Sequence, residues 1–396
     1  MSPIFNSIGS NYDFNFSLKA LGQIFAPDSD KNLEILKFFL EKEFEGQAFL
    51  FYKGRNAIEF ALKNLNLPKN SLVATQAFTC YSIEEAIKKT GLKLIYFDLK
   101  AKSLNPDFKN IKKIYKKNPQ IKAIILQNSL GFANEIEKIY QWSRQNKIIL
   151  ILDLAQSYGI KTANLKNLAD IFILSFGRDK ILDAITGGAC ILKKFDNKLD
   201  LIQNQVAFRQ RLKDLTYPFV CFLIRKTYPI YLGKILHFLV KKTGFETNPI
   251  YNPVKKIAPL PSQYVNLIFR QLKNLDQSLK HRQKISKLYY QNLKNISLIN
   301  QTDIENGVNL RFPIWVEDIE KVLSSLKAAQ IYLADRWYRK AIDCGKINCQ
   351  TDYRQGTCPN AEKLSQHILN LPTHQEIDET KAIKIINVIS KLENNK

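Results

Sequence analysis

A carboxylate and a lysine follow two consecutive apolar runs of the sequence. The run KIILILD ends at Asp153, and the run DIFILS ends at Ser175, five residues before Lys180. A carboxylate at the end of a buried strand is unfavourable unless a cation meets it, although an Asp at this place can also cap a helix. A lysine there is a candidate nucleophile or phosphate contact, although most lysines in a chain are solvated.

Two further segments have the composition of anion sites. Residues 53–57 (KGRNA) open a predicted helix, and the amides of a helix N-terminus attract phosphate. Ser175 offers a hydroxyl beside the turn amides that follow it, and residues 186–188 (TGG) suit a close backbone approach. Pyridoxal phosphate needs this combination, because it requires a phosphate cup, an acid beside its pyridine nitrogen and a lysine that bonds to it covalently.

Alternating strands and helices must position these groups. From Phe49 to about Lys194, short runs rich in Ile, Leu and Val alternate with amphipathic segments. Such a pattern indicates a mostly parallel sheet covered on both faces, which binds ligands beyond the carboxyl ends of its strands. We expect strands at 71–75, 93–98, 121–127, 147–153, 170–175 and 188–193, and helices at 56–66, 82–90 and 135–146.

The sequence divides into three parts. Residues 1–48 read as an arm and one helix that starts near residues 28–30, and residues 49–255 as a large α/β domain. In residues 256–396 strands and helices no longer alternate regularly, which predicts a smaller α+β domain. Within it we expect a long helical stretch at 262–293, a strand at 308–316, a helix at 319–329 and a closing amphipathic helix.

The order and spacing of these motifs resemble the DegT/StrS-type sugar aminotransferases, a branch of the fold-type-I pyridoxal-phosphate enzymes. The resemblance runs from about Phe51 to Leu392 and is strongest in DLAQSYG (153–159), SFGRDKILDAITGG (175–188) and the closing part from ADRWY (334–338) to LPTHQEID (371–378). It implies an α/β fold with a mostly parallel, seven-strand-type sheet between helices, a smaller C-terminal domain, and pyridoxal 5'-phosphate as cofactor.

The resemblance also implies a role for each motif residue. Lys180 is then the lysine that bonds to the cofactor, Asp153 pairs with the pyridine nitrogen, and Gln156 contacts the hydroxyl side of the ring. Lys180 and Asp153 are the expected catalytic residues, and Arg178 and Arg336 are candidate substrate residues. The expected cofactor-binding set, in which Ser175 and the first amides of the helix hold the phosphate, is Gly54, Arg55, Asn56, Phe78, Cys80, Tyr81, Asp153, Gln156, Ser175 and Lys180.

Three positions depart from the family pattern. The aromatic residue that stacks on the ring aligns with Cys80, between Phe78 and Tyr81, and either neighbour is a substitute. Thr186 stands where the family often has Glu before its Gly-Gly pair. Residues 255–263 (KKIAPLPSQ) lack the Asn-x-Arg that reaches a neighbouring subunit's cofactor phosphate, although two lysines lie there.

A basic and apolar insert at about 205–250 makes the chain longer than its relatives. It includes LTYPFVCFLIRKTYPIYLGKILHFLVKKTG (215–244), in which Pro218 and Pro229 are expected to break any single long helix. Its internal charges argue against a membrane-spanning helix. Two interpretations stay open, namely two short amphipathic helices on an anionic membrane surface, or an insertion that packs on the enzyme or at a dimer interface.

The composition limits which kinds of binding partner and which cellular location we expect. The chain has 59 Lys and Arg against 36 Asp and Glu, a net charge of +23, which attracts anions; the lysines are spread out, however, so nucleic acid is not an expected partner. We expect a cytoplasmic protein, because the N-terminus has no secretory pattern and six cysteines are too few for a disulfide framework. No bound metal is expected, because the spacing of Cys344, Cys349, Cys358, His367 and His374 matches no zinc motif. We therefore expect these cysteines to be free thiols and these histidines to be ordinary side chains.

These features predict a pyridoxal-phosphate-dependent aminotransferase. By resemblance it moves an amino group from an amino acid, commonly glutamate, to a nucleotide-linked keto-sugar for cell-surface polysaccharide or glycan precursors, and it is a homodimer. One alternative is an enzyme for an amino-acid-like substrate, which needs an arginine for the α-carboxylate. The other is a non-catalytic membrane- or anion-binding descendant, which the retained Asp153, Ser175 and Lys180 oppose.

Overall fold

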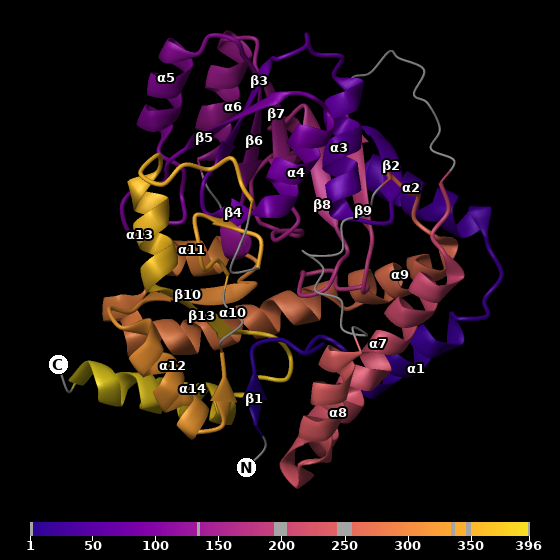
Figure 1. Cartoon of the computed structure of the whole chain (residues 1–396), viewed down its shortest axis with the longest axis vertical. Coiled ribbons are helices and arrows are strands. Elements are labelled where there is room, and N and C mark those ends of the chain that lie inside the picture. Colours follow the sequence, from indigo (N-terminus) through magenta and orange to yellow (C-terminus); the bar gives the residue numbers. More distant parts are fainter. Residues whose placement is uncertain are drawn as a thin grey trace.

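A seven-stranded sheet forms the centre of the molecule (Figure 1). The computed structural model describes residues 3–132, 135–193, 204–243, 256–333, 337–345 and 350–394. β9 runs in the opposite direction to the other six strands of this sheet, so the expected mostly parallel α/β sheet is confirmed. The strands lie in the order β2 (Gln47–Phe51), β9 (Gly188–Leu192), β8 (Ile171–Ser175), β7 (Ile149–Asp153), β6 (Ile121–Gln127), β3 (Leu72–Gln76) and β5 (Lys93–Phe97).

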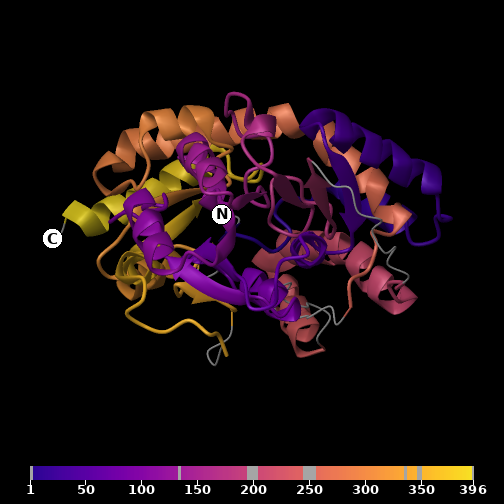
Figure 2. The ribbon, with the colours of Figure 1, turned by 90° about the horizontal axis from the view of Figure 1, so that it is seen from above.

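Helices cover both faces of this sheet because alternate side chains of each strand point to opposite sides. One face packs against α3 (Gly54–Asn64) and α4 (Tyr81–Lys89), with Ile125, Ile151 and Ile173 between them. The other face buries Leu126, Leu152 and Leu174 under α2 (Asp30–Phe44), α5 (Phe108–Lys117), α6 (Ile136–Gln145) and α9 (Val265–Lys273). Seen from above, α9 and α10 (Leu275–Leu293) follow one another along one side of the molecule (Figure 2).

A second hydrophobic cluster surrounds an antiparallel pair of strands in the C-terminal part, and it also includes residues of the large domain such as Phe78 and Tyr96. This pair is β10 (Arg311–Trp315) and β13 (Ile368–Pro372); the surrounding helices include α11 (Gln301–Asn306), α12 (Ile319–Ala328), α13 (Pro359–His367) and α14 (Glu379–Asn394). Two short parallel pairings tie it to the rest, namely β4 (Thr79–Cys80) with β12 (Ile342–Asp343), and β1 (Ile4–Phe5) with β11 (Ile331–Tyr332). The domain boundaries near residues 48 and 255 stay a prediction.

The N-terminal arm and the insert contain helices that differ from the expected ones. The arm has a helix, α1 (Phe14–Gly22), that the sequence did not predict. The insert forms α7 (Phe208–Thr227) and α8 (Leu232–Lys242), and the expectation that Pro218 breaks the helix is wrong, because α7 continues through it. The break lies at the 3-10 turn Tyr228–Ile230, which contains Pro229.

The α7 helix packs along α1, and the two lie side by side in Figure 1. The Arg225 guanidinium donates to the carbonyl oxygens of Ile8, at 2.8 Å, and of Tyr12, at 2.5 Å. The body of the protein therefore holds this half of the insert. Within the described part of the chain, no helix is both long and apolar enough to cross a membrane.

Candidate active site

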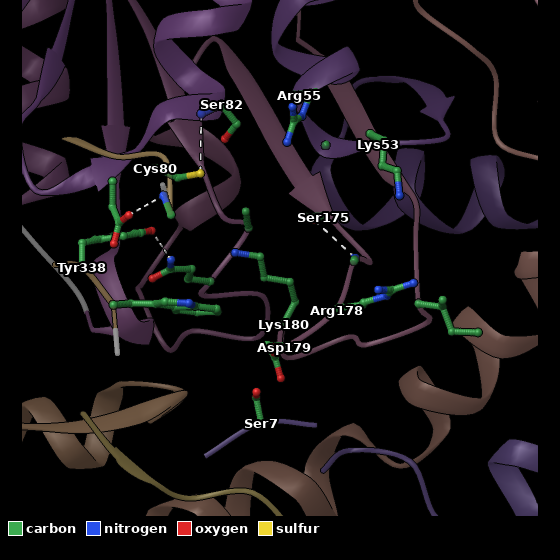
Figure 3. A pocket seen from close by; sticks show the side chains of 18 of the residues that line it. Ser7, Lys53, Arg55, Cys80, Ser82, Ser175, Arg178, Asp179, Lys180 and Tyr338 are labelled. Atoms are coloured by element: carbon green, nitrogen blue, oxygen red, sulfur yellow. Dashed lines mark hydrogen bonds between the residues drawn. The ribbon is translucent and has the colours of Figure 1, made fainter. Parts of the chain in front are cut away.

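A cavity of about 740 Å³ lies beyond the carboxyl ends of β6, β7 and β8 (Figure 3). Asp153 is the last residue of β7 and Ser175 is the last residue of β8, and both line the cavity. Lys180 lines it from the loop between β8 and β9. The parallel strands thus bring the three residues together at one edge of the sheet, as their sequence positions predict.

Lys180 and Asp153 share the buried end of the cavity. Burial lowers the pKa of Lys180, and the nearby Cys80 and Asp153 oppose that effect. Burial raises the pKa of Asp153, while the Ala155 N–H at 2.9 Å and the charge of Lys180 lower it. The Lys180 Nζ lies 4.8 Å from the centre of the Trp337 ring, so the amine has an aromatic wall beside it.

Gln156 links three segments of the chain around this end. Its Oε1 accepts the Leu130 N–H at 2.7 Å, and its Nε2 donates to the Tyr338 hydroxyl at 2.6 Å. Phe78 packs edge-on against the Tyr338 ring, with 5.2 Å between the ring centres. Gln156 therefore fixes a C-terminal tyrosine over the carboxyl end of β7.

The start of α3 forms the other end of the cavity. A Cβ atom on Gly188 would lie 2.6 Å from the Cα of Gly54, so only glycine lets β9 approach the helix start this closely. The Ser175 hydroxyl accepts the Gly177 N–H at 3.3 Å beside it. The Arg55 side chain does not supply a free charge, because it pairs with Glu85 at 2.6 Å.

Two further cations lie at this end, Lys53 and Arg178 (Figure 3). Burial lowers the pKa of Lys53 to about 8, although Asp214 opposes the shift. Burial also disfavours the charge of Arg178, but Tyr217 and Asp214 outweigh it and hold the pKa above its usual range. The helix amides and Lys53 make this end suitable for a phosphate group.

Arg178 connects the site to the insert. It forms a buried ion pair with Asp214 of α7 at 3.4 Å, and its guanidinium carbon lies 3.6 Å from the centre of the Tyr217 ring. Asp214 also accepts hydrogen bonds from the hydroxyls of Tyr52 and Tyr264. Removing α7 would therefore leave buried polar groups of the site without partners.

Comparison with known protein families shows which family the chain belongs to. The sequence model of the DegT/DnrJ/EryC1/StrS aminotransferase family matches residues 44–209 and 265–390. The chain belongs to this family. It is a pyridoxal-phosphate-dependent aminotransferase, as the motifs around Asp153 and Lys180 predict.

One relative of this aminotransferase has a UDP-linked sugar in its name, and solved structures share its fold. A UDP-2-acetamido-2-deoxy-3-oxo-D-glucuronate aminotransferase from Pseudomonas aeruginosa is 22% identical over 337 residues, which cover 84% of this chain and 82% of the relative. The crystal structure of NtdA from Bacillus subtilis, with bound cofactor PMP, is 19% identical, covers 99% of this chain and 85% of its own, and has a TM-score of 0.73. PseC from Helicobacter pylori, an aminotransferase involved in the biosynthesis of pseudoaminic acid, is 16% identical over 100% of both chains, with a TM-score of 0.71.

The side chains of this aminotransferase fit a polar cofactor. Asn128 follows β6 and lines the cavity, its side chain is buried, and neither its Nδ2 nor its Oδ1 has a hydrogen-bond partner within the part of the chain that the structure describes. Leaving such buried groups unpaired costs about 1–3 kcal/mol each. A polar ligand beside Asn128 removes this cost, and the helix start and Lys180 suit the two ends of pyridoxal phosphate.

Most of the expected site residues line the cavity of the aminotransferase. Asn56, Phe78 and Tyr81 do not line it, and Arg336 lies outside the described residues. The sequence reasoning included Lys53 in a candidate anion site but gave its side chain no role, and it missed Asn128, Tyr217 and Trp337, although Trp337 belongs to the ADRWY motif. The expected residues that do line it are Gly54, Arg55, Cys80, Asp153, Gln156, Ser175, Arg178 and Lys180.

Histidine, cysteine and carboxylate side chains occur throughout the ranges that the structure describes. No group of three or more His, Cys, Asp or Glu residues within those ranges could hold a metal ion. Cys80, Cys190, Cys221 and Cys358 are free thiols. Cys344 is disulfide-bonded, so the expectation of a free thiol is wrong at that position.

Proposed function

We propose that this aminotransferase transfers an amino group from glutamate to a nucleotide-linked keto-sugar, as a step in making a cell-surface polysaccharide or glycan precursor. The observation that carries this proposal is a single cavity in which Lys180 and Asp153 lie at one end and a cationic helix start at the other. The name of the relative from Pseudomonas aeruginosa supports a UDP-linked 3-oxo sugar as the acceptor.

Each residue of the site has a separate role in the proposed transamination. Pyridoxal phosphate, when bound, supplies the carbonyl group and the electron sink that carry an amino group from donor to acceptor. Lys180, whose pKa burial lowers, is a neutral amine at lower pH than an exposed lysine, so it can take a proton from a substrate carbon and return it. Asp153 supplies a buried carboxylate for a cationic ring nitrogen.

The phosphate end of the site works by position and charge. The first amides of α3 and the Ser175 hydroxyl would donate hydrogen bonds to the cofactor phosphate, and Lys53 would add positive charge, whereas Arg178 is paired with Asp214. Gln156 keeps Tyr338 beside the reacting end through the hydrogen bond at 2.6 Å. These groups would hold the cofactor in position beside the Lys180 amine.

We also propose a cytoplasmic homodimer that contacts the inner face of the membrane through α8. Apolar side chains on this helix and its preceding turn are exposed, including Ile235 at 57% and Phe238 at 64%. Lys234 and Lys242 accompany them, as in helices that bind anionic lipid surfaces. Light scattering should give the mass of a dimer, and the mass of a monomer would refute the homodimer. The protein should co-sediment with anionic vesicles at low salt, and a protein that stays in the supernatant would refute the membrane contact.

The acceptor is tested directly with the purified holoenzyme. Incubation with glutamate and UDP-2-acetamido-2-deoxy-3-oxo-D-glucuronate should give the amino sugar and 2-oxoglutarate, both measured by mass spectrometry. Lys180→Ala is the control and should give neither product. Amination of 2-oxo acids alone, with no reaction of any UDP-linked keto-sugar, would contradict the proposal and favour an amino-acid-like substrate.

A further inference from the structure

Part of the cavity wall comes from segments that the family's sequence model does not match. The model begins at residue 44 and skips residues 210–264. The N-terminal segment nevertheless lines the cavity with residues 5–8, and the insert lines it with Tyr217, Tyr228, His237 and Lys241. These lining residues therefore lie outside the segments that the family model matches, whereas Asp153 and Lys180 lie within them.

Ion pairs and hydrogen bonds fix this added wall in place. Asp214 pairs with Arg178 inside the site, and Arg225 donates to the carbonyl oxygens of Ile8 and Tyr12. The Phe5 ring packs edge-on against Tyr228 at 4.8 Å and stacks on Tyr332 at 5.4 Å. The wall is thus tied to the catalytic end through Arg178 and to the C-terminal part through Tyr332.

The α8 helix presents two different faces. His237 and Lys241 are four residues apart, so they lie on one face, and both line the cavity. Ile235, Phe238 and Leu239 lie elsewhere on the helix and are exposed. One face of α8 therefore brings a cation and an imidazole to the cavity, together with the half-buried Tyr228 and Tyr332 rings from neighbouring segments.

The proposed transamination uses none of these groups. Lys180 and Asp153 serve the reacting end, and the start of α3 serves the cofactor phosphate. A lysine and a histidine beside aromatic rings are suited to a diphosphate with an attached base, because the cation and the imidazole bond the phosphate oxygens and the rings provide a flat apolar contact. A volume of about 740 Å³ lies within the range of pockets that hold drug-sized ligands.

We propose that the insert and the N-terminal segment form the subsite for the nucleoside diphosphate of the substrate, in which His237 and Lys241 bind the diphosphate and the cluster of Phe5, Tyr228 and Tyr332 contacts the base. This inference rests on the proposed function, since it assigns the far part of the same nucleotide-linked substrate. It makes the insert a specificity element of the active site.

Binding of UDP to the holoenzyme tests the subsite by isothermal titration calorimetry. The double variant His237→Ala, Lys241→Ala should bind UDP about five- to tenfold more weakly, because it loses two partly exposed polar contacts to the diphosphate. Lys242→Ala is the matched control, since Lys242 is the next residue of α8, carries the same charge and is not among the cavity-lining residues. It should bind UDP within twofold of the unaltered protein.

Four further measurements distinguish a failure of the subsite from a failure of the proposed function. Lys241→Glu should weaken UDP binding more than Lys241→Ala, and thermal unfolding of every variant should match that of the unaltered protein. Glutamate should change the visible spectrum of the bound cofactor at the same rate in all the α8 variants; absence of this change in the unaltered protein would count against the proposed function and leave the UDP test intact.

Undetectable UDP binding to the unaltered holoenzyme, or equal UDP binding by the double variant, would overturn the subsite. Inorganic pyrophosphate should bind more weakly than UDP, and equal binding would overturn the role of the aromatic cluster.

Discussion

Gly188 of β9 lies against the first residue of α3, so one added methyl group tests the architecture of the cofactor site. In Gly188→Ala the new Cβ would lie 2.6 Å from the Gly54 Cα, 2.7 Å from the Gly54 N and 2.9 Å from the Leu174 O. All three are backbone atoms, so the helix start must move by about 0.8 Å to restore an ordinary contact of 3.4 Å. A shift of this size takes amide donors out of the 2.7–3.2 Å range of N–H···O hydrogen bonds.

The expected loss follows from those hydrogen bonds. A bond to a charged group contributes about 1.5–3 kcal/mol, so losing one weakens cofactor binding about 10- to 150-fold. Overpacking should also lower the free energy of unfolding by about 1–3 kcal/mol. Absorbance titration of the apoenzyme with pyridoxal phosphate measures the affinity, and urea unfolding measures the stability.

Gly22→Ala is the matched control for this substitution. A Cβ at Gly22 would meet no atom within 4 Å, and the residue ends α1 far along the chain from the site. We expect cofactor affinity to stay unchanged and stability to rise slightly, because alanine favours helix more than glycine does. If Gly188→Ala bound the cofactor as tightly as Gly22→Ala, the close approach of β9 and α3 would not shape the phosphate site.

Three other substitutions test separate parts of the account. Asp214→Asn should lower the free energy of unfolding by about 3 kcal/mol in urea, because it leaves Arg178 buried without its carboxylate, and a loss below about 1 kcal/mol would contradict this. Asp153→Asn keeps the shape of the side chain without its charge, so turnover should fall about 10²- to 10³-fold while cofactor still binds; unchanged turnover would contradict the assigned role. Burial lowers the pKa of Lys53 to about 8, so its charge is present below pH 8 and lost above it. Affinity for pyridoxamine phosphate should therefore fall from pH 7 to pH 9 in the unaltered protein and stay level in Lys53→Met, and parallel pH profiles would contradict the contact.

The sequence predicts the sheet and the reacting end of the site because both depend on local patterns. Apolar runs define the strands, and Asp153, Ser175 and Lys180 directly follow two of them, so their place at the carboxyl edge is set by the topology of a parallel sheet. The sequence also predicts the close backbone approach at the Gly-Gly pair, since Gly188 is where β9 approaches α3.

Other parts of the site depend on contacts between distant segments. Trp337 reaches Lys180 from the C-terminal part, and Asp214 reaches Arg178 from the insert. No local periodicity marks such pairs. The same limit applies to Pro218, since α7 remains helical through it while packed on α1, a tertiary contact that the propensity of proline does not describe.

The most direct test of the central claim is to identify which lysine bonds to the cofactor. Two lysines line the cavity with lowered pKa values, Lys180 and Lys53, so the structure itself offers a rival. The holoenzyme is reduced with borohydride, digested, and analysed by mass spectrometry for the phosphopyridoxyl group. The account predicts the group on Lys180 and its loss in Lys180→Ala; a modified Lys53, or no modified lysine in protein that retains the cofactor, would contradict it.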